Sequence, residues 1–444
     1  MRPFRGLAAN LYFARQDLVF GLGRALAAPL LAAAARACFA VQLDRLAVRF
    51  ALRASRLSDS RYCAALLRKH LAEVAHFCTE MLPSPQPLHT LDNRCVVLAE
   101  PLIVEGSVKR KGVLLVSFSD TAGILFASAN TVHLARLFHV VLEPSSAGYA
   151  NPDLLCWLRY PDQVIVQSSE AKDRCFLTTL NSNLIPVSYG AGDWVEVCDE
   201  EFNGLAQTKI YDAICVSNYG WWKRTHAFLK AVSTARRQCP DYRAALVLAQ
   251  LGKCSESVSR LQALIDRYRL DGHIHVMEDL KRNALLEVYA SSKVLVFPSW
   301  KEGSSRVLFE AMAVDLPVIV LKRNVGVNKE YIVPDTGMLV SERDLSSILV
   351  DLYHQRPQTR ARSWFLEHLG PDNTTQKLVE DIRRLFPAED WMREDMAVKV
   401  NAPEARIRGS TLQEKPLSLW LDSTQIRLAP SVIPSDSDAR EKYK

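Results

Sequence analysis

Short runs of apolar, mostly β-branched residues alternate with amphipathic helical segments through most of this sequence, and this alternation limits the fold more than any other feature. One series of runs begins after Asn93 and another near Tyr211. The runs are Cys95–Leu98, Val113–Phe118, His139–Leu142, Val164–Gln167 and Leu184–Val187, then Ala213–Ser217, Ala245–Ala249, Ile274–Met277, Val294–Pro298 and Pro317–Leu321. Continuous apolar strands separated by helices are typical of parallel sheets covered on both faces. The sequence therefore predicts an α/β protein with two doubly wound domains facing a cleft.

The rest of the chain is arranged around these two domains. Its 444 residues are too many for a single core. We expect a helical extension over residues 1–88, a first Rossmann-like domain over 89–208, a second over 209–388, and a partly disordered tail over 389–444 that includes Ser431–Lys444. Helices are expected at Thr225–Arg237, Glu256–Tyr268 and Thr375–Phe386. The last of these either closes the second domain or crosses back to the first.

The net positive charge of the chain comes entirely from its N-terminal part. The net charge is +6, and residues 1–80 hold 12 Lys and Arg against 5 Asp and Glu. The longest uncharged stretch in that region, Ala25–Ala35, is 11 residues, well short of the roughly 20 that a membrane span requires. Residues 1–80 either contact a membrane surface as an amphipathic helix or pack on the protein. Nucleic-acid binding is not expected, because the arginines are not interleaved with aromatic residues.

Cysteine and histidine spacing argues against a metal site. The ten cysteines are widely spread, with no CxxC pair and no paired histidines nearby. Buried, reduced thiols in a cytoplasmic protein, at most peripheral to a membrane, are the simplest interpretation. No DxD pair follows a strand, as a nucleotide-bound cation would need. We therefore expect no bound metal.

The segment Val294–Val320 combines a buried strand, a polar loop and a helix. The strand ends at Pro298, and a helix is expected to begin near Ser304. Free backbone amides and the helix dipole at such a start favour a phosphate group, and glycine lets the backbone approach it closely. The residues of this predicted phosphate cradle are Gly303, Ser304, Ser305 and Arg306.

Two carboxylates flank this cradle. Glu302 precedes it, and Glu310 lies about two helical turns beyond it. Because carboxylates repel a phosphate, these side chains suit hydroxyl groups on either side of it, one set on a sugar and one on a ribose. The alternative is that Glu302 caps the helix and Glu310 is a solvated surface charge, since two glutamates at this spacing often occur by chance.

A second strand, loop and helix begin the same domain, in the segment Ile214–Val232. Lys223 and Arg224 lie where the loop meets the helix. Cations at this place could neutralise a diphosphate leaving group. A solvated surface pair is the alternative, and it is less persuasive because both loops follow strands of one sheet.

Two loops of the first domain are weaker candidates. Glu143 follows a strand, so it is expected to face the cleft and to orient an acceptor hydroxyl or stabilise positive charge on a reacting sugar. An exposed glutamate in a Pro, Ser and Gly turn is nearly as consistent with the sequence. Gly190, Gly192 and Asp193 follow another strand and either line the cleft or form an interdomain turn.

From Tyr211 to Phe386 the chain resembles the GT-B glycosyltransferases, specifically the retaining family four, known as glycosyl transferases group 1. The resemblance rests on Lys223 between a strand and a helix, on the strand end Phe297–Ser299, and on Glu302 and Glu310 followed by AMAVDLPVIV. It implies Lys223 on the donor diphosphate, Glu302 near the sugar hydroxyls and Glu310 on the ribose. The chain departs from the family pattern in that Asn218 replaces a usual arginine, EGSS replaces EGFG, and Glu143-Pro144 replaces a usual His-Gly. The family's glycine-rich first loop is not recognisable either.

We therefore predict a metal-independent glycosyltransferase that moves a hexose from a nucleotide sugar to a hydroxyl of a glycan, lipid or small molecule, as in polysaccharide biosynthesis. Retention of configuration is what the resemblance implies. Lys223, Glu302 and Glu143 are the predicted catalytic residues, and Arg224, Gly303, Ser304, Ser305, Arg306 and Glu310 are predicted to bind the donor. No cofactor is expected, because the nucleotide sugar is a substrate. A non-catalytic GT-B scaffold that binds glycans or proteins, or a sugar-nucleotide epimerase, are the alternatives.

Overall fold

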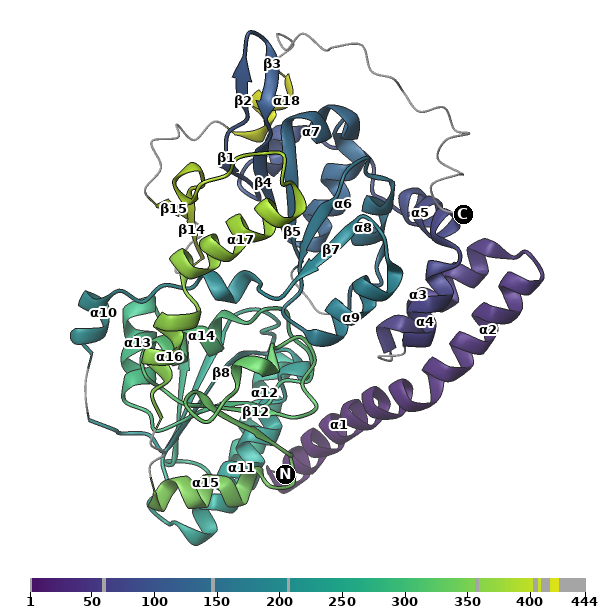
Figure 1. The fold of residues 1–444 in the computed structure, drawn as a ribbon. Coiled ribbons are helices and arrows are strands. Elements are labelled where there is room, and N and C mark those ends of the chain that lie inside the picture. Colours follow the sequence, from purple (N-terminus) through teal and green to yellow (C-terminus); the bar gives the residue numbers. More distant parts are fainter. Residues whose placement is uncertain are drawn as a thin grey trace.

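The computed structural model describes residues 2–57, 61–144, 148–205, 208–355, 359–401, 406–408 and 416–422. Two α/β domains are stacked one above the other, and a long helical rod runs along one side of both (Figure 1). The first sheet extends from Cys95 to Val187 and the second from Ala213 to Val340. The architecture is thus the predicted pair of facing α/β domains with a helical N-terminal region.

The first domain is built on a five-stranded sheet with the order β1-β4-β5-β6-β7. Its strands are β1 (Cys95–Ala99), β4 (Gly112–Ser117), β5 (Phe138–Glu143), β6 (Val164–Gln167) and β7 (Leu184–Val187). All residues of β5 and β6 are buried, as expected for parallel strands covered on both faces. Only β1 departs from the prediction of a parallel sheet, because it pairs with β4 in the antiparallel direction. A hairpin of β2 (Leu102–Val104) and β3 (Ser107–Arg110) connects the two.

Helices from distant parts of the chain cover this sheet. One face carries α6 (Ser119–Ser128), α8 (Pro152–Leu155) and α9 (Ala171–Leu180), together with the N-terminal helices α3 (Asp44–Leu57), α4 (Arg61–Arg68) and α5 (Leu71–Glu80), and α7 (Thr131–Leu137) lies nearby. Val48, Leu67 and Val74 share a core cluster with Leu114 and Val116 of β4. The N-terminal helices are therefore part of this domain's core.

The other face of the first sheet is covered by α17 (Pro371–Leu385). Leu378, Val379 and Ile382 of this helix pack in one cluster with Leu115 of β4 and Ile165 of β6. The helix expected at Thr375–Phe386 thus crosses back to the first domain, as the second of the two predicted arrangements requires.

The second domain has a fully parallel six-stranded sheet with the order β10-β9-β8-β11-β12-β13. Its strands are β8 (Ala213–Asn218), β9 (Ala244–Ala249), β10 (Ile274–Glu278), β11 (Leu295–Phe297), β12 (Val318–Leu321) and β13 (Gly337–Val340). The helices are α11 (Thr225–Gln238), α12 (Ser255–Tyr268), α13 (Arg282–Ala290), α14 (Arg306–Ala313), α15 (Leu345–His354) and α16 (Ala361–His368). Strand β13 was not predicted. It begins at Gly337, where a Cβ would lie 2.0 Å from the carbonyl oxygen of Val318.

A helical rod links the two domains along one side (Figure 1). It consists of α1 (Arg2–Leu22), a π-helical turn η1 (Gly23–Ala27) and α2 (Ala28–Ala40). Helix α1 packs on α12 of the second domain, where Ala9 joins the core, and α2 packs on α3. The rod is therefore anchored to one domain at each end.

The C-terminal residues that the structure describes are packed on the first domain. Strand β14 (Val398–Val400) is buried and pairs with β15 (Arg406–Arg408). In α18 (Leu417–Asp422), the Trp420 ring lies edge-on to Phe138 at 6.1 Å. These segments of the expected tail, residues 389–444, are thus structural. Ser431–Lys444, predicted to be disordered, lies outside the described residues.

Candidate active site

Lys223 and Glu302 are brought into direct contact by two neighbouring loops of the second domain. Lys223 ends a short 3-10 helix, η5 (Trp221–Lys223), after β8, and Glu302 lies between β11 and α14. Strands β8 and β11 are parallel neighbours, so their carboxyl ends lie at the same edge of the sheet. Lys223 Nζ donates to both carboxylate oxygens of Glu302, at 2.8 and 2.7 Å. The two side chains are 18% and 9% exposed, so this is a largely buried ion pair.

The predicted phosphate cradle lies beside this pair, at the start of α14. The helix begins at Arg306, and its N-cap, Ser305, makes no side-chain capping hydrogen bond. The orphan amides of the first helical turn therefore lack the usual side-chain acceptor at this end. Arg306 itself points elsewhere, since its Nη1 donates to the carbonyl oxygen of Asn401 at 3.0 Å.

A glycine-containing loop of the first domain closes against this helix start. The backbone amide of Gly192 donates to Ser304 Oγ at 2.7 Å. A Cβ on Gly192 would lie 2.2 Å from the Phe309 ring, so only glycine permits this approach. The buried carboxylate of Asp193 accepts from Tyr331 of the second domain at 2.7 Å. The loop therefore lines the cleft and also forms an interdomain contact, so the two interpretations of its sequence are compatible.

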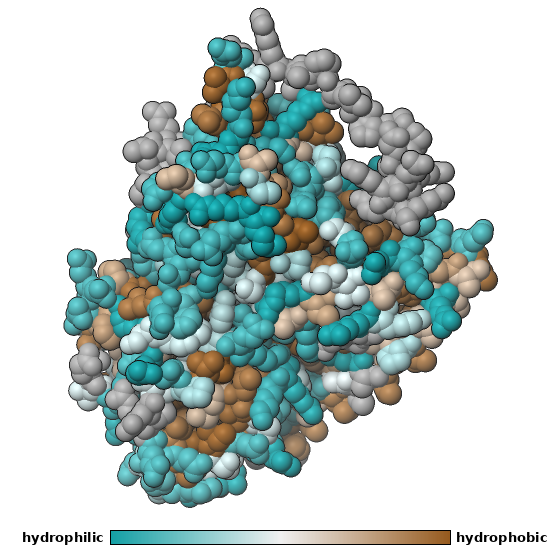
Figure 2. All heavy atoms as spheres, in the orientation of Figure 1, coloured by the Kyte–Doolittle hydropathy of each residue, from teal (hydrophilic) through white to brown (hydrophobic). Residues whose placement is uncertain are grey.

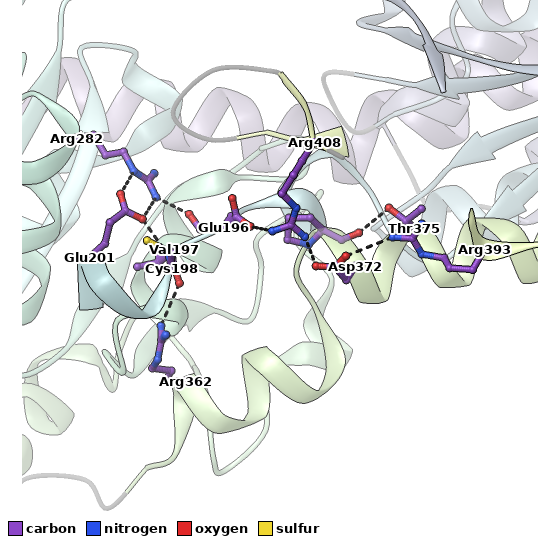
Figure 3. Close-up of polar contacts among 11 residues, drawn as sticks. Glu196, Val197, Cys198, Glu201, Arg282, Arg362, Asp372, Thr375, Arg393 and Arg408 are labelled. Atoms are coloured by element: carbon purple, nitrogen blue, oxygen red, sulfur yellow. Dashed lines mark hydrogen bonds and ion pairs between the residues drawn. The ribbon is translucent and has the colours of Figure 1, made fainter. Parts of the chain in front are cut away.

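Glu310 lies on α14 with its carboxylate largely buried. Burial raises its pKa, and Arg282 Nη1 on α13 lies 3.8 Å away. Arg282 also donates from Nε to Glu201 at 2.9 Å, in the segment that links the two domains (Figure 3). That linking segment is further held by Arg362 and Arg408, which bind the carbonyl of Val197 and the carboxylate of Glu196 (Figure 3). Glu310 is thus partly compensated by an arginine that also fixes the interdomain link.

Arg224 points away from Lys223 although it follows directly in sequence. Its backbone is in the left-handed region, with a φ of +55°, and its side chain is only 1% exposed. The guanidinium is held by Asp17 of α1 and by Glu342, with Nη2 at 2.9 and 2.8 Å from their oxygens. This cation is already paired with two carboxylates, so the geometry does not support the expected role of Arg224 as a ligand of the diphosphate.

Glu143 is buried beneath the C-terminal strand. Its carboxylate accepts from Ser117 Oγ at 3.1 Å and forms an ion pair with Lys399 of β14, which is only 1% exposed. The alternative interpretation, a turn with an exposed glutamate, is inconsistent with this burial. The geometry does not support the expected role of Glu143 in orienting an acceptor, because its charge is taken up by a partner 256 residues away in sequence.

A small interdomain cavity contains polar groups that sequence reasoning missed. Its volume is about 10 Å³, roughly what one water molecule requires. Gln167, at the carboxyl end of β6, lines it and is 1% exposed, and neither of its amide atoms has a hydrogen-bond partner among the described residues. Gly303 and Ser304 of the predicted cradle line its other side. The sequence signal that could have identified Gln167 is its position as a polar residue at the end of an apolar strand.

Asp173 lines the same cavity and is the most perturbed carboxyl group there. Burial raises its pKa to about 6, although the amides of Gly148 and Tyr149 donate to its carboxylate. Glu170 lies beside it and accepts from the amide of Gly326 at 2.6 Å. The first domain thus presents acidic and amide groups to the cradle of the second. Within the described residues, no cluster of three or more His, Cys, Asp or Glu side chains could hold a metal ion.

Two α/β domains face each other across their strand ends, and one of them bears a basic and acidic pair beside an uncapped helix start, which is the arrangement of a GT-B fold. Residues 211–354 match the family model described as Glycosyl transferases group 1. This match lies within the second domain, in the part of the chain that resembles this family. No curated protein matches the sequence.

Several solved structures are similar to this one at low sequence identity. The pneumococcal O-GlcNAc transferase GtfA, solved with UDP and GlcNAc, has a TM-score of 0.48 and 15% identity, over 61% of this chain and 56% of that chain. Anabaena HepE with UDP has a TM-score of 0.47 and 19% identity, over 61% and 79%. The C-terminal domain of a group 1 glycosyl transferase from Francisella tularensis, LpcC, has a TM-score of 0.32 and 20% identity, over 40% and 94%. The match thus spans little more than half of GtfA, and similarity of this degree transfers no substrate.

Proposed function

We propose that the protein is a glycosyltransferase that moves a hexose from a nucleotide sugar to an acceptor hydroxyl. The observation that carries this proposal is the buried Lys223–Glu302 pair beside the uncapped start of α14. The family match over residues 211–354 supports it. We further propose that transfer retains the configuration at the anomeric carbon and needs neither a metal nor a cofactor.

In this proposal each group of the site has one task. The amides at the start of α14 and the ammonium of Lys223 bind the diphosphate and stabilise the charge that it acquires as the bond to the anomeric carbon breaks. Glu302 accepts hydrogen bonds from sugar hydroxyls, and its contact with Lys223 fixes the distance between sugar and diphosphate sites. The acceptor oxygen bonds to the anomeric carbon and its proton leaves with the diphosphate. Positioning the acceptor is then the main task of the first domain.

Nucleotide binding tests this proposal directly. UDP and GDP are titrated calorimetrically, and a panel of sugar nucleotides is screened for hydrolysis. Lys223→Ala should weaken binding of the preferred nucleotide by about tenfold or more, since a charge-assisted hydrogen bond contributes about 1.5–3 kcal/mol. Lys230→Ala, which removes an exposed lysine of α11, is the matched control. A wild-type protein that binds no nucleotide would favour the non-catalytic scaffold instead.

We also propose that α1 and α2 contact an anionic membrane surface from the cytoplasmic side. Seven apolar side chains on the rod and just beyond it are exposed: Leu7, Leu11, Leu18, Val19, Leu26, Leu30 and Val41. Leu7, Leu11 and Leu18 of α1 are spaced by four and seven residues, which places them on one side of that helix. Hydrophobic side chains follow the edge where α1 and α2 run (Figure 2). None of the helices in the described ranges is long and apolar enough to cross a membrane.

The charges on the rod favour anionic lipid as its partner. Arg5, Arg15 and Arg36 are exposed, and Asp17, the only acidic residue between positions 2 and 43, points inward to Arg224. An apolar face bordered by arginines without exposed acid is the pattern of interfacial helices. A groove of about 660 Å³ between α2 and Tyr62 adds apolar surface at the same place. The wide spread of the ten cysteines, with no CxxC pair in the sequence, supports the cytoplasmic location. A lipid-linked or glycan acceptor at the membrane is consistent with this placement.

Vesicle flotation tests the membrane proposal. The full-length protein should float with vesicles that contain phosphatidylglycerol and less with pure phosphatidylcholine. Replacing Leu11, Leu18 and Leu30 by Ser should abolish flotation, because each buried leucine contributes about 1.5 kcal/mol or more. The same change at the exposed Leu251 and Leu366 of the second domain is the control. Flotation of the triple Ser variant would contradict the proposal, and so would a wild-type protein that forms dimers instead of binding vesicles.

A further inference from the structure

One carboxylate of the N-terminal rod reaches both loops of the proposed donor site. Asp17 lies on α1, and its side chain is 23% exposed. Oδ1 accepts from Arg224 Nε at 3.1 Å and from Trp300 Nε1 at 2.7 Å. Oδ2 accepts from Arg224 Nη2 at 2.9 Å and lies 3.1 Å from His226 Nε2. The group thus makes four polar contacts with residues more than 200 positions away.

Two of these partners, Arg224 and Trp300, belong to the loops that carry Lys223 and Glu302, and His226 lies in the first turn of α11. Arg224 follows Lys223 directly, and Trp300 precedes Glu302 by two residues. The loops also meet through their backbones, because the amide of Trp300 donates to the carbonyl of Trp222 at 2.8 Å. Asp17 therefore connects the same two loops that the Lys223–Glu302 ion pair connects.

Aromatic contacts add to this attachment. The Phe20 ring of α1 lies 5.9 Å from Trp221 and 5.4 Å from Trp300, and Phe13 stacks on His226 at 4.4 Å. The Arg224 guanidinium lies 4.5 Å from the Trp300 ring centre. The loops are therefore supported by α1, which precedes both sheets in sequence and packs on the second domain.

The charges show what the loss of Asp17 would change. Burial raises the pKa of Asp17, but hydrogen bonds from His226, Arg224 and Trp300 outweigh it and hold the pKa well below its usual range. Without this carboxylate, the buried Arg224 would keep one carboxylate partner among the described residues, Glu342, which is about half exposed. A buried cation that loses a partner rearranges or draws in water. Because Lys223 is the preceding residue, such a rearrangement changes its position.

We propose that Asp17 is a positioning residue of the donor site, which holds Lys223 and Glu302 at the separation that a sugar diphosphate requires. This inference rests on the proposed function of those two residues. The N-terminal rod is then part of the donor site although Asp17 does not touch the donor. The proposed membrane face and the donor-site contact lie on opposite sides of one helix.

Asp17→Asn in the full-length protein tests this role. We expect its dissociation constant for UDP or GDP, whichever the wild type binds, to rise about tenfold. This change corresponds to a loss of about 1.4 kcal/mol of binding free energy. The KM for the hydrolysed sugar nucleotide should rise with it, and Asp17→Glu should restore part of the affinity. Asp44→Asn, which removes an exposed acid at the start of α3, is the matched control and should bind as the wild type does.

A second variant keeps the test valid if Asp17→Asn does not fold. Trp300→Phe removes the Nε1–H donor to Asp17 and retains an aromatic ring, so a smaller loss of affinity is expected. Each dissociation constant is measured where circular dichroism shows a folded variant, because a merely structural role would lower the melting temperature and leave that constant unchanged. Wild-type affinity in both folded variants would overturn the inference alone. A wild type that binds neither nucleotide would overturn the proposed function and this role together.

Discussion

At the scale of single residues, backbone conformation and burial decide which charged side chains can face the cleft. Lys223 and Arg224 are adjacent, yet the positive φ of Arg224 directs it toward α1 while Lys223 bonds Glu302. Asp173 is buried beside the interdomain cavity, with a pKa raised to about 6. Because of this raised pKa, the stability of the protein should depend on pH.

Asp173 should make stability fall with rising pH. Its folded-state pKa of about 6 exceeds the ordinary value of 3.8, so the folded protein favours the protonated form. The resulting contribution to the free energy of unfolding is fully present below about pH 4 and is lost as the pH rises through 6. A shift of this size corresponds to about 3 kcal/mol.

Urea unfolding of the wild type and Asp173→Asn between pH 4 and pH 7 checks this expectation. The asparagine can accept from the amides of Gly148 and Tyr149 but does not ionise, so its stability should decline less over that interval. Parallel stability curves for the two proteins would show that Asp173 titrates normally in the folded state.

At the scale of elements, the C-terminal strand β14 is attached to the first domain through one buried ion pair. Lys399 and Glu143 are both almost fully buried and bind each other. Breaking a buried pair by removing one partner leaves an uncompensated charge and costs about 3–5 kcal/mol, whereas replacing both partners by apolar residues is often neutral.

Lys399→Met should therefore lower the free energy of unfolding by about 3 kcal/mol, and Glu143→Met with Lys399→Met should recover most of that loss. Chemical unfolding of both variants and the wild type measures the difference. If the double variant were as unstable as the single one, the loss would come from packing around Trp194, whose ring lies 5.7 Å from Lys399 Nζ, and not from the unpaired carboxylate.

At the scale of the whole molecule, local sequence patterns predicted the framework and long-range contacts determined the rest. The predicted strands of both domains match observed strands within a few residues, because buried parallel strands require continuous apolar runs. The short β13 begins with a glycine and lacked such a run. Lys223 and Glu302 were predicted together because both loops follow strands of one sheet.

The residues that were missed or misplaced depend on partners far away in sequence. Asp17 lies 207 residues from Arg224, and Lys399 lies 256 residues from Glu143. The periodicity of a local sequence gives no information about pairs so far apart. The orientation of Arg224 and the burial of Glu143 therefore could not be predicted from the local pattern. Gln167 ends a predicted strand, but the absence of a partner for its side-chain amide among the described residues is visible only where the two domains meet.

The rod formed by α1, η1 and α2 is fastened to the second domain at one end and to α3 of the first at the other. A rod attached at both ends limits the angle by which the two domains can rotate relative to each other. Any wider opening, for ligand entry or product departure, must be absorbed by the five π-helical residues Gly23–Ala27 or by detachment of one end. The width to which the cleft between the domains can open would then depend on how readily the rod bends.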